Sequence, residues 1–135
     1  MDFLSSAWEA KRLSTIRVRN NKQLVRNFVQ DVLTNHNIEA PDKYFVQKPI
    51  RNNEPVIGIE GFKQSRLRLF QEFPDSRTTV DRNVAECDQV FAMVTATATN
   101  KEPAKTVTIQ TVDLCRIGDC KITEHWDTVD ESGIA

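Results

Sequence analysis

The second half of the chain restricts the possible fold most, because it consists of strand patterns joined by short turns. The patterns are rich in threonine, valine and other residues that favour strands. They occupy four successive segments, 78–86, 90–99, 106–116 and 121–129. The connections at 87–89 and 117–120 are short, and such connections join antiparallel neighbours. We therefore expect a four-stranded antiparallel meander.

Two helical patterns precede this meander. Between residues 20 and 34, apolar residues recur every three or four positions, and a second such pattern covers 61–73. Pro74 ends the second pattern, because proline has no backbone N–H to donate. Helices followed by a meander indicate an α+β domain. We expect a cone-shaped, curved antiparallel sheet wrapped around the N-terminal helices, with a ligand cavity at its mouth.

The expected organisation is a single domain at 20–130, preceded by an extension at 1–19 and followed by a tail at 131–135. Trp8 and Leu13 indicate a further amphipathic helix within the extension. Three positions for that helix stay open: it caps the pocket, packs on a partner subunit or remains mobile.

Composition excludes several classes of protein. A net charge of −1 argues against a general nucleic-acid binder, and no apolar run approaches the roughly 20 residues of a membrane span. The N-terminus lacks the pattern of a signal peptide, and three cysteines suit a reduced compartment, so we expect a cytoplasmic protein. The cysteines show no metal-ligand spacing with His36 or His125, so we expect no metal.

The last strand pattern carries an unusual density of titratable residues. Glu124, His125, Asp127 and Asp130 surround Trp126, although strands are depleted in aspartate. This crowding suggests that some of these side chains are directed at a ligand.

The direction of those side chains depends on the register of the last hairpin, and two registers are open. If the turn carries a bulge at Cys120, Asp113 faces His125 and Thr111 faces Asp127. All four side chains then point into the cone. The tryptophan between His125 and Asp127 then lies on the outer sheet face.

The alternative is a plain two-residue turn at 118–119. Asp113 then faces Glu124, while His125 and Asp127 point to the other face of the sheet, because a slip of one residue exchanges every partner.

Three stretches, at 73–90, 95–99 and 112–127, resemble the SnoaL-like polyketide cyclases of the nuclear-transport-factor-2-like superfamily. The resemblance covers about residues 20–130. It implies a cone-shaped α+β barrel, often dimeric through the outer sheet face, and it favours the bulged register. We expect a homodimer with Trp126 near the contact.

The resemblance also implies site residues. An aspartate late in the terminal strand of these cyclases acts as the acid/base of an intramolecular aldol closure, and it corresponds to Asp127. A histidine two residues earlier is retained as His125. Positions that hold a pocket histidine and glutamine in the family carry Asp113 and Thr111, and an Asn-Pro pair falls on 48–49.

Two turn glycines that are common in the family are also replaced, by Cys87 and Cys120. Glycine suits such turns because it reaches positive φ without strain. We expect Gly118 to supply this conformation in the last hairpin.

These residues suggest acid/base chemistry in an apolar cone. Desolvation and the neighbouring Asp113 are expected to raise the pKa of Asp127, so that it can transfer protons near neutral pH. His125 would share a proton with Asp113 or orient a substrate oxygen. Lys48 would stabilise an enolate or bind a carboxylate. Thr111 and Cys115 would also contact the substrate, and no metal or organic cofactor is needed.

Two functions are consistent with the sequence. The first is a small-molecule enzyme that acts on an apolar carbonyl compound by aldol-type cyclisation, isomerisation or hydration. The alternative is a non-catalytic dimeric domain that binds a small apolar ligand in the cone, with Asp127 and His125 as a structural pair. A catalytic member should have a polar cluster in the cavity, whereas a binder should have an almost entirely apolar one.

Overall fold

The computed structural model describes residues 3–51, 54–55, 58–101 and 104–130. The tail at 131–135 therefore lies outside the described residues. Helices precede the main strands, as expected. The elements are α1 (Phe3–Phe28), the π-helical segment η1 (Val29–Thr34), α2 (Pro41–Tyr44), β1 (Phe45–Arg51), β2 (Glu54–Pro55), α3 (Gly58–Glu72), β3 (Arg77–Glu86), β4 (Gln89–Lys101), β5 (Ala104–Gly118) and β6 (Lys121–Asp130).

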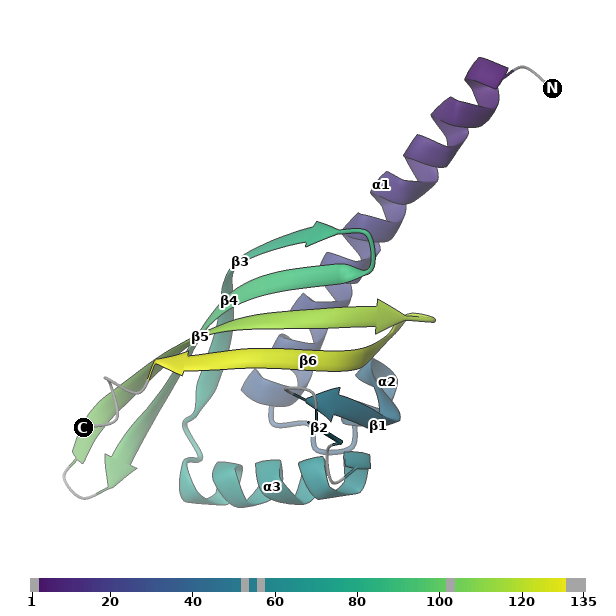
Figure 1. Ribbon diagram of the computed structural model, residues 1–135. Coiled ribbons are helices and arrows are strands. Elements are labelled where there is room, and N and C mark those ends of the chain that lie inside the picture. The colour runs from purple at the N-terminus through teal and green to yellow at the C-terminus, as the bar shows by residue number, and fades with distance from the viewer. Residues whose placement is uncertain (1–2, 52–53, 56–57, 102–103, 131–135) are drawn as a thin grey trace.

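The strands form one sheet in the order β2-β1-β6-β5-β4-β3 (Figure 1). The antiparallel meander of β3 to β6 is confirmed. One feature was not expected: β1 runs parallel to β6, so the sheet is mixed. The parallel pair is possible because α3 and the meander provide the long crossover connection that parallel strands need.

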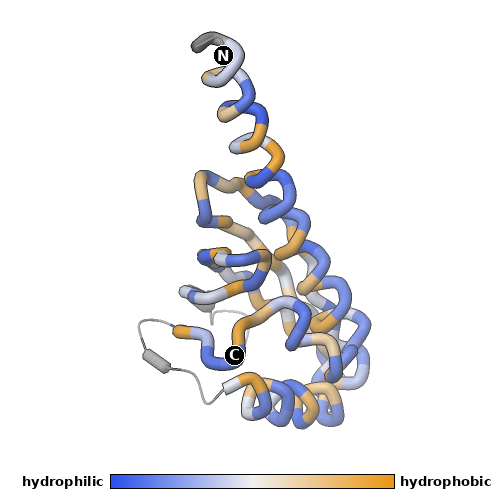
Figure 2. Tube along the Cα trace, turned by 90° about the vertical axis from the view of Figure 1, so that its right-hand side faces the viewer, coloured by the Kyte–Doolittle hydropathy of each residue, from blue (hydrophilic) through white to orange (hydrophobic). Residues whose placement is uncertain are grey.

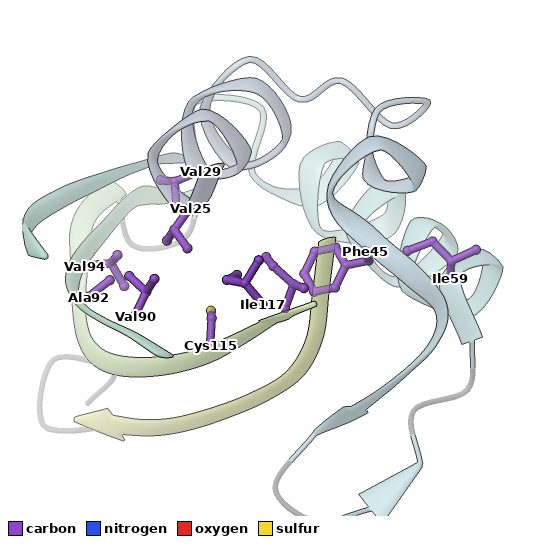
Figure 3. Packing of buried hydrophobic residues seen from close by; sticks show 10 residues of the cluster. Val25, Val29, Phe45, Ile59, Val90, Ala92, Val94, Cys115 and Ile117 are labelled. Carbon is purple, nitrogen blue, oxygen red and sulfur yellow. The ribbon is translucent and has the colours of Figure 1, made fainter. Parts of the chain in front are cut away.

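The sheet curls around the second half of the helical segment, and the core lies between them. Val25 of α1 and Val29 of η1 are buried against the inner face of β4 and β5 (Figure 3). Along β4, buried and exposed residues alternate, because successive side chains point to opposite sheet faces. Val90, Ala92 and Val94 are buried on the inner face. The expected α+β cone fold is confirmed.

The residues expected as an N-terminal extension are part of α1. The segment 3–28 contains neither glycine nor proline and is rich in good helix formers, so nothing interrupts the helix. Residues 5–17 are exposed, and this half of α1 projects past the sheet (Figures 1 and 2). None of the helices in the described ranges is long and apolar enough to cross a membrane.

The last hairpin adopts neither of the two expected registers. Its turn consists of Asp119 and Cys120, which have φ values of 48° and 63°, and Gly118 pairs with Lys121. Thr123 then bulges out of β6, because Ile117 pairs with Ile122 but the next pair is Arg116 and Glu124. Both alternatives placed the turn or the bulge wrongly.

The consequence is a shift of two residues from the bulged register that the resemblance favoured. Asp113 faces Asp127, Cys115 faces His125 and Thr111 faces Val129. A shift of two keeps every side chain on its expected face, since the side-chain period of a strand is two.

Glycine is not the residue that supplies the left-handed conformation at these turns. Cys87 and Cys120 themselves have positive φ, at 53° and 63°, so the expected role of Gly118 is wrong. A Cβ atom at Gly118 would lie 3.2 Å from Cγ2 of Thr123. Gly118 therefore makes room for the bulged threonine instead.

Candidate active site

The inner face of β5 and β6 carries a layer of polar residues above an apolar floor. Ile117 and Ile122 are buried where the two strands leave their turn and form this floor.

The polar layer lies further along the same two strands. Cys115 of β5 pairs with His125 of β6, and two residues further from the turn Asp113 pairs with Asp127. These positions share one face, because alternate residues of a strand point the same way.

Asp113 is held by two neighbours on its own sheet. The Thr111 hydroxyl donates a hydrogen bond of 3.3 Å to Oδ2 of Asp113. Nε2 of His125 lies 3.6 Å from Oδ1 of the same carboxylate, and both side chains are mostly buried. That distance is too long for a hydrogen bond, but a protonated imidazole would form an ion pair there. His125 and Asp113 thus lie near each other across a diagonal of the ladder, and the expected sharing of a proton stays a prediction.

Asp127 is the most buried of these carboxylates, with its side chain 10% exposed. Nη2 of Arg51, at the end of β1, donates a 2.7 Å hydrogen bond to its Oδ2. Arg51 reaches this position because β1 pairs with β6 and sets it beside His125. The guanidinium stabilises the ionised carboxylate. It therefore opposes the rise in pKa that we expected from burial and from Asp113.

A second arginine, Arg66 of α3, approaches the same carboxylate. Burial is the largest cause that lowers the pKa of Arg66, and the nearby charge of Arg51 lowers it further. The charge of Asp127 raises it. Cζ of Arg66 lies 5.5 Å from the centroid of the Phe62 ring. Its buried Nε has no hydrogen-bond partner among the described residues.

Cys115 forms the wall next to the carboxylates. The thiol is buried, and burial together with the charge of Asp113 raises its pKa to about 12. A thiol with this pKa stays protonated at neutral pH and is a poor nucleophile. Cys115 therefore contributes a packing surface rather than a reactive group. All three cysteines of the chain are free.

Lys48 is the predicted site residue that the structure does not bring to this cluster. It is exposed, in the part of β1 where pairing with β6 is interrupted between Phe45 and Ile50. It forms no hydrogen bond or ion pair with another described residue. Within the described ranges, no group of three or more acidic, histidine or cysteine side chains is placed to hold a metal ion.

Sequence reasoning missed both arginines. Arg51 stands at the end of β1, and nothing local in the sequence marks it. Arg66 did carry a signal, because it lies four residues after Phe62 and four before Phe70, on the buried stripe of its helix. A charged residue on a buried helical face is rare unless it is paired or has a function.

The comparisons with known proteins agree with this fold. Residues 23–135 match the sequence pattern of the family described as SnoaL-like polyketide cyclase. Among proteins with curated descriptions, none matches the chain.

Solved structures are similar along most of the chain. A "putative polyketide cyclase" from Acidithiobacillus ferrooxidans is 25% identical, with 85% of this chain and 91% of that chain covered and a TM-score of 0.74. A SnoaL-like polyketide cyclase from Agrobacterium tumefaciens is 18% identical, with 78% and 88% covered and a TM-score of 0.69. A "putative hydroxylase" from Streptomyces galilaeus is 20% identical, with 87% and 93% covered and a TM-score of 0.72. The last two likenesses establish the fold alone.

Proposed function

The chain belongs to the SnoaL-like polyketide cyclase family, and from this premise we propose that it is a small-molecule enzyme with Asp127 as its acid/base. The observation that carries the proposal is the setting of Asp127. Its carboxylate is largely buried on the inner sheet face, opposite Asp113, and is bonded by Arg51. A general base must be unprotonated when it acts, and an adjacent guanidinium favours that form.

The proposed reaction begins with a carbonyl compound that has a hydrogen on the adjacent carbon. Asp127 takes that proton, and the electron pair of the C–H bond forms an enolate. In an aldol-type cyclisation the enolate carbon attacks a second carbonyl group of the same molecule, and Asp127 returns the proton to the new alkoxide. In an isomerisation the proton returns to a different carbon instead. The thiol of Cys115 and the Thr111 hydroxyl would contact the substrate beside the reacting carbons.

His125 and Asp113 have a positioning role in this scheme. Asp113, held by Thr111, orients the imidazole at 3.6 Å, and the imidazole would hydrogen-bond a substrate oxygen. Lys48, which is exposed on β1, would bind substrate from outside this cluster.

The test is Asp127→Asn, assayed with a panel of polyketide-type carbonyl compounds. The variant keeps shape but loses the proton carrier, so turnover should fall at least about 100-fold, the lower end for general acid/base catalysis. Glu124→Gln is the matched control, because Glu124 lies on the same strand but pairs with Arg116 on the outer face. Equal turnover by Asp127→Asn and the wild type would overturn the proposal.

A binding domain without catalysis is the second candidate. It is favoured by the 2.7 Å bond between Arg51 and Asp127, which occupies one carboxylate oxygen and would suit a structural pair. In that case Asp127→Asn would lower stability without any turnover to lose.

We further propose that the protein is a homodimer that uses the outer sheet face. Val84, Phe91, Met93 and Val112 are exposed there, and Val84 pairs with Phe91 while Met93 pairs with Val112. A depression of about 310 Å³ lies beside Met93 and Val112. A contiguous exposed apolar patch of this kind marks an interaction site.

Trp126 belongs to the same outer face, opposite Leu114, with the Arg116 guanidinium 5.8 Å from its ring centroid. We propose that it lies at the edge of the contact. We also propose a cytoplasmic location, which the three free thiols support.

A further inference from the structure

Two arginines from separate elements converge beside the proposed acid/base, which comes from a third element. Arg51 comes from β1, Arg66 from α3 and Asp127 from β6. Burial and the charge of Arg51 lower the pKa of Arg66, and the charge of Asp127 raises it. Asp113 lies opposite Asp127 on the neighbouring strand, so two guanidiniums stand with two carboxylates. Arg51 forms an ion pair with Asp127, whereas Arg66 forms none with a described residue. A guanidinium without an ionic partner favours an anion.

The geometry of Arg66 shows where that anion would bind. The Phe62 ring lies against the guanidinium, at 5.5 Å from Cζ, and helps to fix its plane. The buried Nε has no hydrogen-bond partner in the described part of the chain. An unsatisfied buried donor costs free energy, and few are retained without a reason.

Another arginine with a buried Nε, on the outer sheet face, provides a comparison. Nε of Arg116 also lacks a hydrogen bond, but it lies 3.6 Å from a carboxylate oxygen of Asp88, so it has an ionic partner. Arg66 has no ion pair with any described residue. The guanidinium of Arg66 therefore lacks the ionic partner that Arg116 has.

We propose that Arg66, assisted by Arg51, binds a carboxylate of the substrate beside Asp127. This inference rests on the proposed function and narrows its substrate to a carbonyl compound that carries a free carboxylate. Nε and Nη of an arginine form a planar fork that matches the two oxygens of a carboxylate. A monoanion adds one negative charge to a cluster of two guanidiniums and two carboxylates, whereas a dianionic phosphate would add two.

The role of such a contact is to fix the position of the reacting carbon. Only one N–H group of Arg51 is used by Asp127, and a guanidinium has five. Arg51 can therefore bond the catalytic carboxylate and the substrate at once. A substrate held by Arg66 at one end would present its carbonyl end to Asp127 in a fixed orientation.

The experiment measures binding of 2-acetylbenzoate, a stable keto acid, and of its methyl ester, by titration calorimetry. The wild type should bind the acid at least about 10-fold more tightly than the ester, since a hydrogen bond to a charged group accounts for about 10- to 100-fold. Arg66→Met should remove this preference while changing ester binding less than about 3-fold. Arg66→Lys should retain part of it, because it keeps the charge but loses the fork.

Arg68→Met is the matched control, because Arg68 lies on the same helix but is exposed; it should keep the preference. Equal binding of acid and ester by the wild type, or no binding of either at millimolar concentration, would overturn the inference even if Arg66→Met fails to fold. Tighter competition by inorganic phosphate than by acetate would overturn the assignment to a carboxylate.

The outcomes separate this inference from the proposed function. Turnover of carbonyl compounds without any preference for the acid would reject the carboxylate site alone. A preference for the acid that persists in Asp127→Asn, together with no turnover by the wild type, would reject the enzyme proposal alone.

Discussion

The two faces of β5 and β6 both carry charged residues, but the charges find their partners in different ways. On the outer face Arg116 pairs with Glu124 of the neighbouring strand, at 3.2 Å, and with Asp88 in the preceding hairpin, at 3.6 Å. On the inner face Asp127 takes its partner from β1, and a second arginine approaches from α3. Outer-face charges are thus balanced within the meander, whereas the inner cluster exists only when the whole domain has assembled.

The apolar residues of the sheet show the same contrast. Inner positions such as Val90 and Ile122 are fully buried against the helices, while Val84, Phe91 and Met93 on the outer face are exposed. An inner apolar residue supports the fold of one chain, and an outer one is available to a partner. Substitutions on the two faces should therefore separate folding, association and chemistry.

The largest expected effect is on folding. Ile122→Ala removes a side chain that is 0% exposed beneath the polar layer, so the free energy of unfolding should fall by about 2–5 kcal/mol, the range for such truncations. Val84→Ala, at 65% exposure on the outer face of β3, should change the value for the monomer by less than about 0.5 kcal/mol. Urea denaturation at a protein concentration below the dimer dissociation constant measures both, and equal losses would contradict the assignment of the two faces.

The second largest expected effect is on dimer formation. Phe91→Glu places a charge in the exposed patch on the outer face, and burying it unpaired at a contact should raise the dimer dissociation constant at least about 100-fold. Light scattering over a dilution series measures this constant. The chain should stay folded, because Phe91 does not contribute to the core. A wild type that is monomeric at micromolar concentration would reject the dimer.

The smallest expected effect is a pH dependence of stability from Cys115. Its pKa is raised to about 12 in the folded protein, above the usual value of about 8.5 for an unfolded cysteine. The unfolded chain therefore loses this proton first, and the stabilisation is present below about pH 8.5 and is lost as pH rises towards 12.

The slope from this one group should be about 1.4 kcal/mol per pH unit within that range. The free energies of unfolding of the wild type and Cys115→Ala are measured at about pH 8 and at about pH 10. The difference between their pH slopes is the contribution of Cys115. Cys120→Ala, which removes an exposed thiol, serves as the control. Identical slopes for the wild type and Cys115→Ala would show that Cys115 is not protected by burial.

The sequence predicted the positions of the helices and strands better than the register between the strands. Periodicity located the helices and the four strands, because apolar spacing directly reflects which side chains meet the core. It could not locate the last turn, since Asp119 and Cys120 adopt a left-handed conformation that glycine would normally signal. Nor does local pattern reveal the bulge at Thr123.

The candidate site was predictable in part for a related reason. The inward direction of Asp113, His125 and Asp127 follows from strand alternation and survives a register error of two residues. Arg51 and Arg66 come from elements distant in sequence, and their approach depends on the tertiary packing of β1 and α3. Exposed Lys48 was chosen instead, because only the family resemblance connected β1 with the site.

The central claim is that Asp127 removes a proton from a carbon next to a carbonyl group. Its most direct test is deuterium uptake at the acetyl group of 2-acetylbenzoate and its methyl ester in heavy water, followed by proton NMR. The wild type and Glu124→Gln should exchange these hydrogens faster than buffer does, and Asp127→Asn should be at least about 100-fold slower than the wild type. Exchange by Asp127→Asn at the wild-type rate would contradict the account.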